Sequence, residues 1–224
     1  GLRGLIDVGI SPDDLAERQA RLVGNDWIAL TSGLHPSQAT RPDRAAMLDL
    51  LASQAADGGI VAVGEIGLDY HWDTGKRADA MDLFDAQLAI AEDADLPVVI
   101  HNREADNDVL DLLRRRRPRG VMHCFSQTPE FCRRCLDLDL YISFGGNLTF
   151  KGSGPIRESV AIVPLDRLLV ETDAPYLSPV PVRGRPNHPA HLGFTLRAMA
   201  EQRSLDVTEL ATATARNAIR LFGL

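Results

Sequence analysis

The stretch VAVGEIGLDY, residues 61–70, begins as a buried strand and then places a carboxylate where burial should still be deep. Three apolar residues precede Glu65, which stands between Gly64 and Gly67. A buried carboxylate needs a strong partner, such as an arginine, a shared proton or a metal ion. The rest of the chain must supply that partner.

Short apolar runs of this kind recur along the chain and alternate with amphipathic segments. Seven of them are predicted strands: residues 2–9, 27–35, 59–65, 97–101, 120–123, 140–146 and 167–173. The predicted helices are one opening at Ser11 and Pro12, then residues 42–56, 77–94, 106–117 and 129–138, and a last one capped by Asp206 and ending at Leu221. Repeated β–α units of this kind predict a parallel sheet covered by helices.

The segment 77–94 has a clear helical period. A stripe at i, i+3, i+4 and i+7 consists of Ala80, Leu83, Phe84, Gln87, Leu88 and Ala91. Because most of these side chains are apolar, we expect this face to pack against the core.

Four ionisable residues decide between the two architectures that such units can form. Glu65, His101, His123 and Asp173 each stand at the carboxyl end of a different apolar run. An open sheet would spread these ends along its edge, whereas a closed barrel brings them to one mouth. We therefore predict an α/β fold, a TIM-type (β/α) barrel, as a single domain over residues 1–224. Seven strands fall short of eight, so the first strand and helix of that barrel are expected to be missing from this chain.

Composition and charge narrow the class of protein. The 224 residues are 45% hydrophobic, which suits one enzyme-sized domain. The formal net charge of -7 argues against a broad basic surface, so any nucleic-acid partner must be held locally. No apolar run approaches the roughly 20 residues that span a bilayer, and no secretory signal is visible. We expect a cytoplasmic protein without a membrane partner, and no segment indicates an obligate protein partner.

The three cysteines, Cys124, Cys132 and Cys135, do not form a disulfide framework and suit a reducing compartment. Cys132 and Cys135 form a single C-x-x-C pair within a helical segment, which we interpret as helix-face residues rather than a zinc or redox site.

The arginine run RRRRPR, residues 114–119, ends a predicted helix. We interpret it as a solvated helix end rather than a DNA-binding patch.

Two imidazoles and two carboxylates that converge on one point form a ligand set for a divalent cation such as zinc, manganese or magnesium. A cation favours the ionised form of buried carboxylates and the neutral form of histidine. A metal ion is thus the partner that the sequence predicts for Glu65.

Several ordered motifs carry a family resemblance. They are GEIGLDY (64–70), VIHNR (99–103), HCFS (123–126), YISFGG (141–146), ETDAPYL (171–177) and RNAIRLFGL (216–224). Together they resemble the TatD family of metal-dependent deoxyribonucleases and cover nearly the whole chain. The resemblance implies a TIM-type barrel of the amidohydrolase superfamily. It also implies hydrolysis of DNA phosphodiesters, 3′–5′ exonuclease action on single-stranded or frayed ends, and a setting in DNA repair.

The resemblance also implies roles for the four ligands. Glu65 would bridge two metal ions, magnesium, manganese or zinc, and His101 and His123 would complete the shell of one of them. Asp173 would bind the other ion and take the proton from the attacking water, which a carboxylate beside that water can do. Glu171 is left outside the ligand set. The family's H-x-H pair does not occur in this sequence ahead of the first predicted strand. One metal site is therefore expected to lack two of its ligands in this chain.

Three further residues are candidates for substrate binding. His35, in GLHP, could meet a phosphate or the metal-bound water, or could simply bond to backbone. Arg103 could pair with a phosphate, or with a surface acid such as Glu104 or Asp106. Asp69 closes the GLDY segment and could line the mouth, although turn chemistry alone would explain it.

Two other functions remain open. One keeps the metal and cleaves a different bond, as an amidase, lactonase or deacylase. A carbamylated lysine often bridges metals in that class, but Lys76 and Lys151 both lie outside strand ends, which favours the nuclease. The other is a barrel without catalysis, if the protein truly starts at residue 1.

Overall fold

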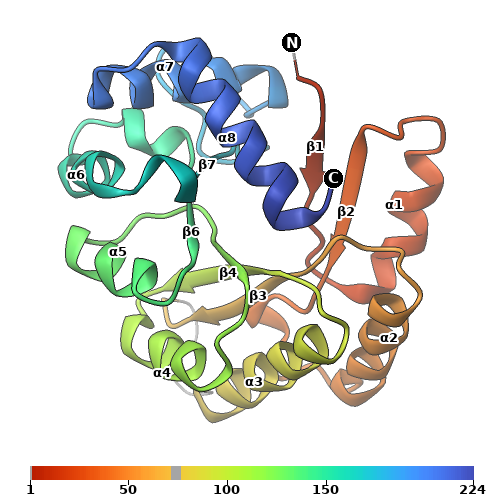
Figure 1. Ribbon diagram of the computed structural model, residues 1–224. Coiled ribbons are helices and arrows are strands. Elements are labelled where there is room, and N and C mark those ends of the chain that lie inside the picture. Colours follow the sequence, from red (N-terminus) through yellow and green to blue (C-terminus); the bar gives the residue numbers. More distant parts are fainter. Residues whose placement is uncertain (1, 72–76) are drawn as a thin grey trace. The chain divides into compact units, whose positions relative to one another are not determined.

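A computed structural model describes residues 2–71 and 77–224 of the chain. Lys76 lies outside the described residues. The chain divides into two compact units, Gly1–Gly120 and Val121–Leu224, and each is described by itself (Figure 1). A single domain over the whole chain stays a prediction.

The first unit consists of four parallel strands with a helical segment after each. The strands are β1 (Leu5–Asp7), β2 (Ile28–Ser32), β3 (Ala62–Asp69) and β4 (Val98–Arg103), paired in chain order. The helical segments are η1 (Pro12–Asp14), α1 (Leu15–Arg21), η2 (Pro36–Gln38), α2 (Arg44–Ala56), α3 (Arg77–Asp93) and α4 (Asp106–Arg116). The predicted alternation of parallel strands and helices is therefore confirmed here.

Helix α3 covers β3 with the stripe that the sequence predicts. All six residues of the stripe are buried, including the polar Gln87. The amide of Gln87 explains its burial: its Oε1 accepts from the N–H of Leu34 at 2.7 Å, and its Nε2 donates to the Leu34 carbonyl at 3.0 Å. This pair of bonds fixes the backbone next to His35.

The second unit continues the same order. Its strands are β5 (Gly120–Met122), which begins one residue before the boundary, β6 (Tyr141–Phe144) and β7 (Leu168–Val170), again parallel. Its helical segments are α5 (Pro129–Leu136), η3 (Gly146–Thr149), α6 (Gly154–Ile162), η4 (Leu165–Arg167), η5 (Pro189–His191), α7 (Leu192–Arg203) and α8 (Val207–Phe222). The sequence analysis did not predict α6 and α7, which follow segments rich in glycine and proline.

Strand β3 corrects one expectation. It does not end at Glu65 but continues to Asp69, so Gly67 to Asp69 are strand. Asp69, its last residue, also makes the hydrogen bond expected of a turn, since its Oδ1 accepts from the N–H of His71 at 2.9 Å. The pairing with β4 is irregular between Val63 and Ile66, where β3 has two residues opposite the single residue Val99. A bulge of this kind re-aims the side chains around it.

Local expectations about helices hold. Asp206 caps α8 by accepting from the N–H groups of Thr208 and Glu209 at 2.8 and 3.1 Å. Cys132 and Cys135 are both buried on α5, as helix-face residues should be.

The arginine run also behaves as a helix end. Helix α4 ends at Arg116, whose guanidinium makes two hydrogen bonds to Asp85 at 3.0 and 2.8 Å. Arg117 then adopts the left-handed conformation that ends the helix.

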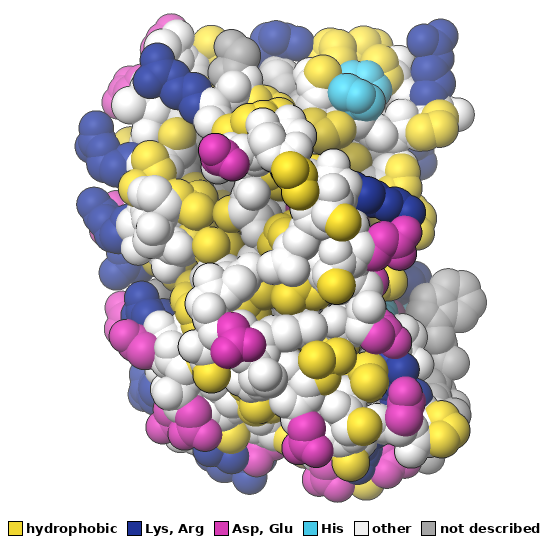
Figure 2. Space-filling view, turned by 90° about the vertical axis from the view of Figure 1, so that its right-hand side faces the viewer, with side chains coloured by type: hydrophobic (Ala, Val, Ile, Leu, Met, Phe, Trp, Pro, Cys, Tyr) yellow, Lys and Arg dark blue, Asp and Glu magenta, His cyan; other side chains and the backbone are white. Residues whose placement is uncertain are grey.

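The surface shows no single dominant charge on the face drawn in Figure 2. Acidic and basic side chains are both present there, with hydrophobic side chains between them. Within the described ranges, no helix combines the length and the apolar character needed to cross a bilayer.

Candidate metal centre

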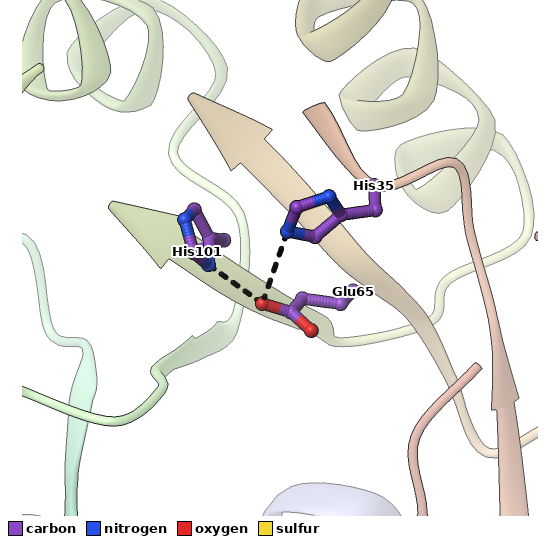
Figure 3. Close-up of side chains that lie close together, drawn as sticks. All are labelled: His35, Glu65 and His101. Atoms are coloured by element: carbon purple, nitrogen blue, oxygen red, sulfur yellow. Dashed lines mark hydrogen bonds and ion pairs between the residues drawn. The ribbon is translucent and has the colours of Figure 1, made fainter. Parts of the chain in front are cut away.

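Three side chains of the first unit face one another (Figure 3). Glu65 projects from β3, His101 from β4, and His35 from the segment after β2. Glu65 Oε1 lies 2.7 Å from His101 Nδ1 and 3.8 Å from His35 Nε2. The sequence-predicted ligands Glu65 and His101 are therefore adjacent, and His35 joins them.

Glycine makes this approach of β3 and β4 possible. A Cβ atom at Gly64 would lie 2.5 Å from Val99 Cβ, and one at Gly67 would overlap the carbonyl oxygen of His101. Gly67 also has a φ of +140°, which side chains disfavour. The two glycines of the opening stretch thus allow the backbone contact that brings Glu65 beside His101.

His101 lies between two carboxylates. Its Nε2 is 3.3 Å from Asp69 Oδ2, opposite the contact with Glu65, and both acids are largely buried. Burial raises the pKa of Asp69, but the bonds from His101 and from the backbone N–H of His71 outweigh it and leave that pKa below its usual value. A carboxylate on the second imidazole nitrogen orients the ring of a ligating histidine. Asp69 is therefore placed to orient the ring of His101, and the substrate-binding role predicted from the sequence stays a prediction.

The ring of His35 is held by its own turn. Its Nδ1 accepts from the N–H of Ser37 at 3.2 Å, as the cap of η2, and lies 2.9 Å from Ser37 Oγ. With its proton on Nε2, the atom that faces Glu65, the ring can donate a hydrogen bond to an anion or a water. With its proton on Nδ1 it donates to Ser37 Oγ and leaves Nε2 open to a metal.

A second group of donors lies in the second unit, at the carboxyl ends of β5 and β7. His123 Nδ1 is 3.0 Å from Glu171 Oε1, and His123 Nε2 is 3.9 Å from Asp173 Oδ1. The thiol of Cys124 lies 3.7 Å from Asp173 Oδ2. The predicted ligands His123 and Asp173 are therefore neighbours, and Cys124 and Glu171 accompany them.

Glu171, predicted to lie outside the ligand set, is a close neighbour of His123 in this group. Burial raises its pKa, but the charge of His123 and hydrogen bonds with Ser143 and the N–H of Cys124 outweigh it and hold that pKa below the usual range. The Oε1 atom is buried and lacks a hydrogen-bond donor of good geometry in the described part of the chain. The alternation of ETD along the strand, with Glu171 two residues before Asp173, was the signal that could have identified it.

Backbone conformation also marks this group. Cys124 and Asp173 have φ values of 47° and 55°. Left-handed conformations are uncommon for residues other than glycine and cluster at functional sites. Both residues stand where the chain leaves a strand end, so the conformation turns their side chains toward His123.

Arg103 is the last residue of β4 and is exposed. Its proposed surface partners have other contacts: Glu104 lies 2.7 Å from His71 Nδ1, and Asp106 accepts from Asn102 at 2.8 Å. The positive charge of Arg103 contributes to the lowered pKa of Asp69, which lies opposite it in the β3–β4 register. Arg103 is thus close to the donors of the first unit.

The donor sets fit a divalent metal ion. Ligand atoms of His35, Glu65 and His101 lie within 4.8 Å of one another, as do those of His123, Cys124 and Glu171. Metal–ligand bonds of about 2.0–2.3 Å put two ligand atoms of one ion at most about 4.6 Å apart. The separations of up to 4.8 Å in each group are close to this limit.

Comparison with known proteins agrees with this chemistry. Residues 1–223 match the model of the family described as TatD related DNase. The metal-dependent hydrolase YabD of Bacillus subtilis is 37% identical over 97% of this chain and 86% of its own length. A Pantoea ananatis relative described as a 3′-5′ ssDNA/RNA exonuclease, TatD, is 35% identical, over all of this chain and 89% of its own.

A solved structure confirms the fold class. The crystal structure of the TatD homologue YJJV from Escherichia coli superposes with a TM-score of 0.92 at 30% identity, covering 100% of this chain and 88% of that one. A TatD family protein from Entamoeba histolytica gives a TM-score of 0.88 at 21% identity, covering 99% of this chain and 85% of that one. The predicted TIM-type barrel class is thereby confirmed.

Proposed function

Because this chain belongs to the TatD family of metal-dependent hydrolases, we propose that it hydrolyses DNA phosphodiesters from the 3′ end of single-stranded or frayed strands. The observation that supports this most directly is the pair of donor groups, Glu65 with His101 and His123 with Asp173. The description of the Pantoea relative as a 3′-5′ exonuclease supports the direction of cleavage. DNA repair is the setting that such an activity would serve.

In this proposal Glu65, His101, His123 and Asp173 are the metal ligands. Divalent ions, when bound, supply a water of lowered pKa and neutralise charge on the attacked phosphate. Asp69 keeps the imidazole of His101 in position through the 3.3 Å contact to Nε2. Glu171 does the same for His123 through the 3.0 Å contact to Nδ1.

Asp173 is the proposed general base. Its carboxylate stands beside His123 and Cys124, and it can accept a proton from a nearby water when ionised. With its proton on Nε2, His35 would donate a hydrogen bond to a phosphate oxygen. Arg103, exposed at the end of β4, would pair with a phosphate in two parallel hydrogen bonds.

The test combines two substitutions with a matched control. Glu65→Gln and Asp173→Asn each remove one charge and keep the shape of the side chain, as does Glu104→Gln at an exposed carboxylate of the same unit as Glu65. Metal binding is measured by titration calorimetry with Mn²⁺, and hydrolysis with a 3′-labelled single strand and a blunt duplex. We expect both ligand variants to lose hydrolysis at least about 100-fold, as for removal of one strong electrostatic catalytic contact, and Glu104→Gln to resemble the wild type.

A substrate panel separates the nuclease from the amidohydrolase alternative. The wild type is given the same oligonucleotide, a lactone and an amide, with Mn²⁺ present. Faster turnover of the lactone or amide than of the oligonucleotide would replace the nuclease by the alternative. Wild-type activity in the Glu65→Gln variant would contradict a metal role for Glu65.

A further inference from the structure

Two segments of the second unit carry basic side chains without any acid. Residues 140–157 and 174–200 contain no Asp or Glu, and their basic residues are Lys151, Arg157, Arg183, Arg185 and Arg197. The whole chain, by contrast, has 31 acidic and 24 basic residues. These segments therefore form a local excess of positive charge on an acidic protein.

The two segments border a surface groove of ≈ 530 Å³. It lies where η3, α6 and α7 pack together with the loop after β7 (Figure 1). Its lining includes Thr149, Arg157, Val180, Phe194, Arg197 and Glu201. The single carboxylate in this set is Glu201, next to the end of the acid-free segment, so the arginines dominate the rest of the groove.

Two arginines are stacked on half-buried phenylalanine rings in this region. The guanidinium of Arg197 lies 4.9 Å from the ring centre of Phe194, and that of Arg183 lies 4.2 Å from the ring centre of Phe150. Among the described residues, neither arginine makes a hydrogen bond or an ion pair with an acid. Stacking orients a guanidinium while its N–H groups stay available for an anion.

The backbone that carries these residues is anchored. The N–H of Val180 donates to Thr149 Oγ1 at 2.9 Å, which ties the loop after β7 to η3. Arg157 donates to the carbonyl of Phe150 at 3.1 Å. The stacked arginines thus stand on a fixed frame, so little ordering of the protein is needed when a ligand binds.

The segments that border the groove are connected along the chain to the donors of the second unit. Segment η3 follows β6, and the loop that contains Arg183 begins after β7 and includes Asp173. Tyr176, at the start of this loop, is 70% exposed, and its N–H donates to the carbonyl of Asp173 at 2.7 Å. An exposed aromatic ring therefore stands beside the proposed general base, on the chain segment that leads to the groove.

We infer that the groove binds the single-stranded nucleic acid that lies 5′ of the cleaved bond. Arg197 and Phe194 line the groove, and Arg183 and Phe150 stand beside it, next to the lining residue Thr149. Each arginine contacts a phosphate, and the exposed edges of the two rings contact bases. Cationic side chains interleaved with aromatic rings are the usual means of holding single strands without sequence preference. The identity of the ligand rests on the proposed function, whereas the groove and its charge do not.

The first test measures binding without catalysis. A fluorescein-labelled oligothymidylate of about ten nucleotides, within the range of known single-strand sites, is titrated by anisotropy in EDTA. The variants are Arg183→Ala/Arg197→Ala and Phe194→Leu. The control is Arg216→Ala, an exposed arginine of α8 that stacks on no ring within the described residues. Thermal unfolding verifies that all variants are folded.

Counterion release sets the expected size of the effect. Each lost phosphate contact reduces the salt slope by about 0.7, which at 0.1 M salt is about fivefold in affinity. The double variant should therefore bind about 25-fold more weakly, with a slope smaller by about 1.4. Phe194→Leu should weaken binding about fivefold or more through lost stacking, and Arg216→Ala should bind as the wild type does.

The second test separates the groove from the catalytic site. With Mn²⁺ present, the double variant should show a higher KM for the oligonucleotide and unchanged hydrolysis of bis(p-nitrophenyl) phosphate, which is too small to reach the groove. Unchanged affinity and salt slope in the double variant would overturn the groove, and so would equal binding of polyglutamate, which would indicate an acidic peptide instead. If the wild type binds through these arginines but hydrolyses neither ester, the groove stands and the proposed function fails.

Discussion

Replacing Gly67 by alanine should damage both the stability and the metal binding of the first unit. Gly67 combines a φ of +140° with a position where Cβ would overlap the backbone carbonyl oxygen of His101. A strained backbone conformation costs about 1–3 kcal/mol, and a clash with backbone cannot be relieved by a side-chain rotation. We therefore expect a loss of at least about 3 kcal/mol in the free energy of unfolding, in the range of severe point mutations.

Two other glycines separate the causes. Gly58 has a φ of +73° but open space around its Cβ position, so Gly58→Ala should cost only about 1 kcal/mol. Gly154, at the start of α6, has neither problem, and Gly154→Ala should be neutral or stabilise by up to about 1 kcal/mol.

The assay is urea unfolding monitored by circular dichroism, with Mn²⁺ titration of each folded variant. Gly67→Ala should also weaken metal binding, because relief of the clash must move β3 away from β4 and therefore Glu65 away from His101. Gly58→Ala and Gly154→Ala should bind metal normally. A Gly67→Ala protein as stable as Gly58→Ala, with unchanged metal affinity, would refute this account of the β3–β4 contact.

Three further outcomes are expected. Gln87→Leu should cost about 1–3 kcal/mol by leaving the buried N–H and C=O of Leu34 unpaired, which urea unfolding would measure. The backbone bonds to Asp206 lower its pKa below 3.8. Its contribution to the free energy of unfolding is therefore present above that pH and is lost as the pH falls through the folded-state pKa. The difference in urea midpoint between wild type and Asp206→Ala should shrink in acid. Burial raises the pKa of Cys132 to about 12, and so a thiol reagent should modify half-exposed Cys124 in the native protein but Cys132 only after unfolding.

The order of the elements could be read from the sequence because it depends on local pattern. Strands β1 to β7 all fall on predicted apolar runs, and the buried face of α3 is the predicted stripe. The two missed helices, α6 and α7, begin after glycine- and proline-rich segments. There, the helical pattern is short, and packing between α6 and α7 supplies what the local sequence lacks.

The residues of the candidate site were easier to predict from the sequence than the way they are arranged. Glu65 and His101 were expected as neighbours and lie 2.7 Å apart. Asp69 was expected in a turn; it ends β3, accepts there from the N–H of His71, and contacts Nε2, the second ring nitrogen of His101. The predicted strand ended with its apolar run at Glu65, whereas β3 continues beyond the bulge next to that residue.

The sequence by itself determined the parallel β–α order, the family, and the residue types that stand at the strand ends. These are local properties, since periodicity and motif spacing can be read from the order of the residues alone. The partners of these residues were visible only in the folded chain: Glu171 beside His123, the turn that holds His35, and the two arginines stacked on phenylalanines. Such contacts depend on bulges, left-handed residues and the packing of distant segments, and these arise only when backbone sterics and burial act together in the folded chain.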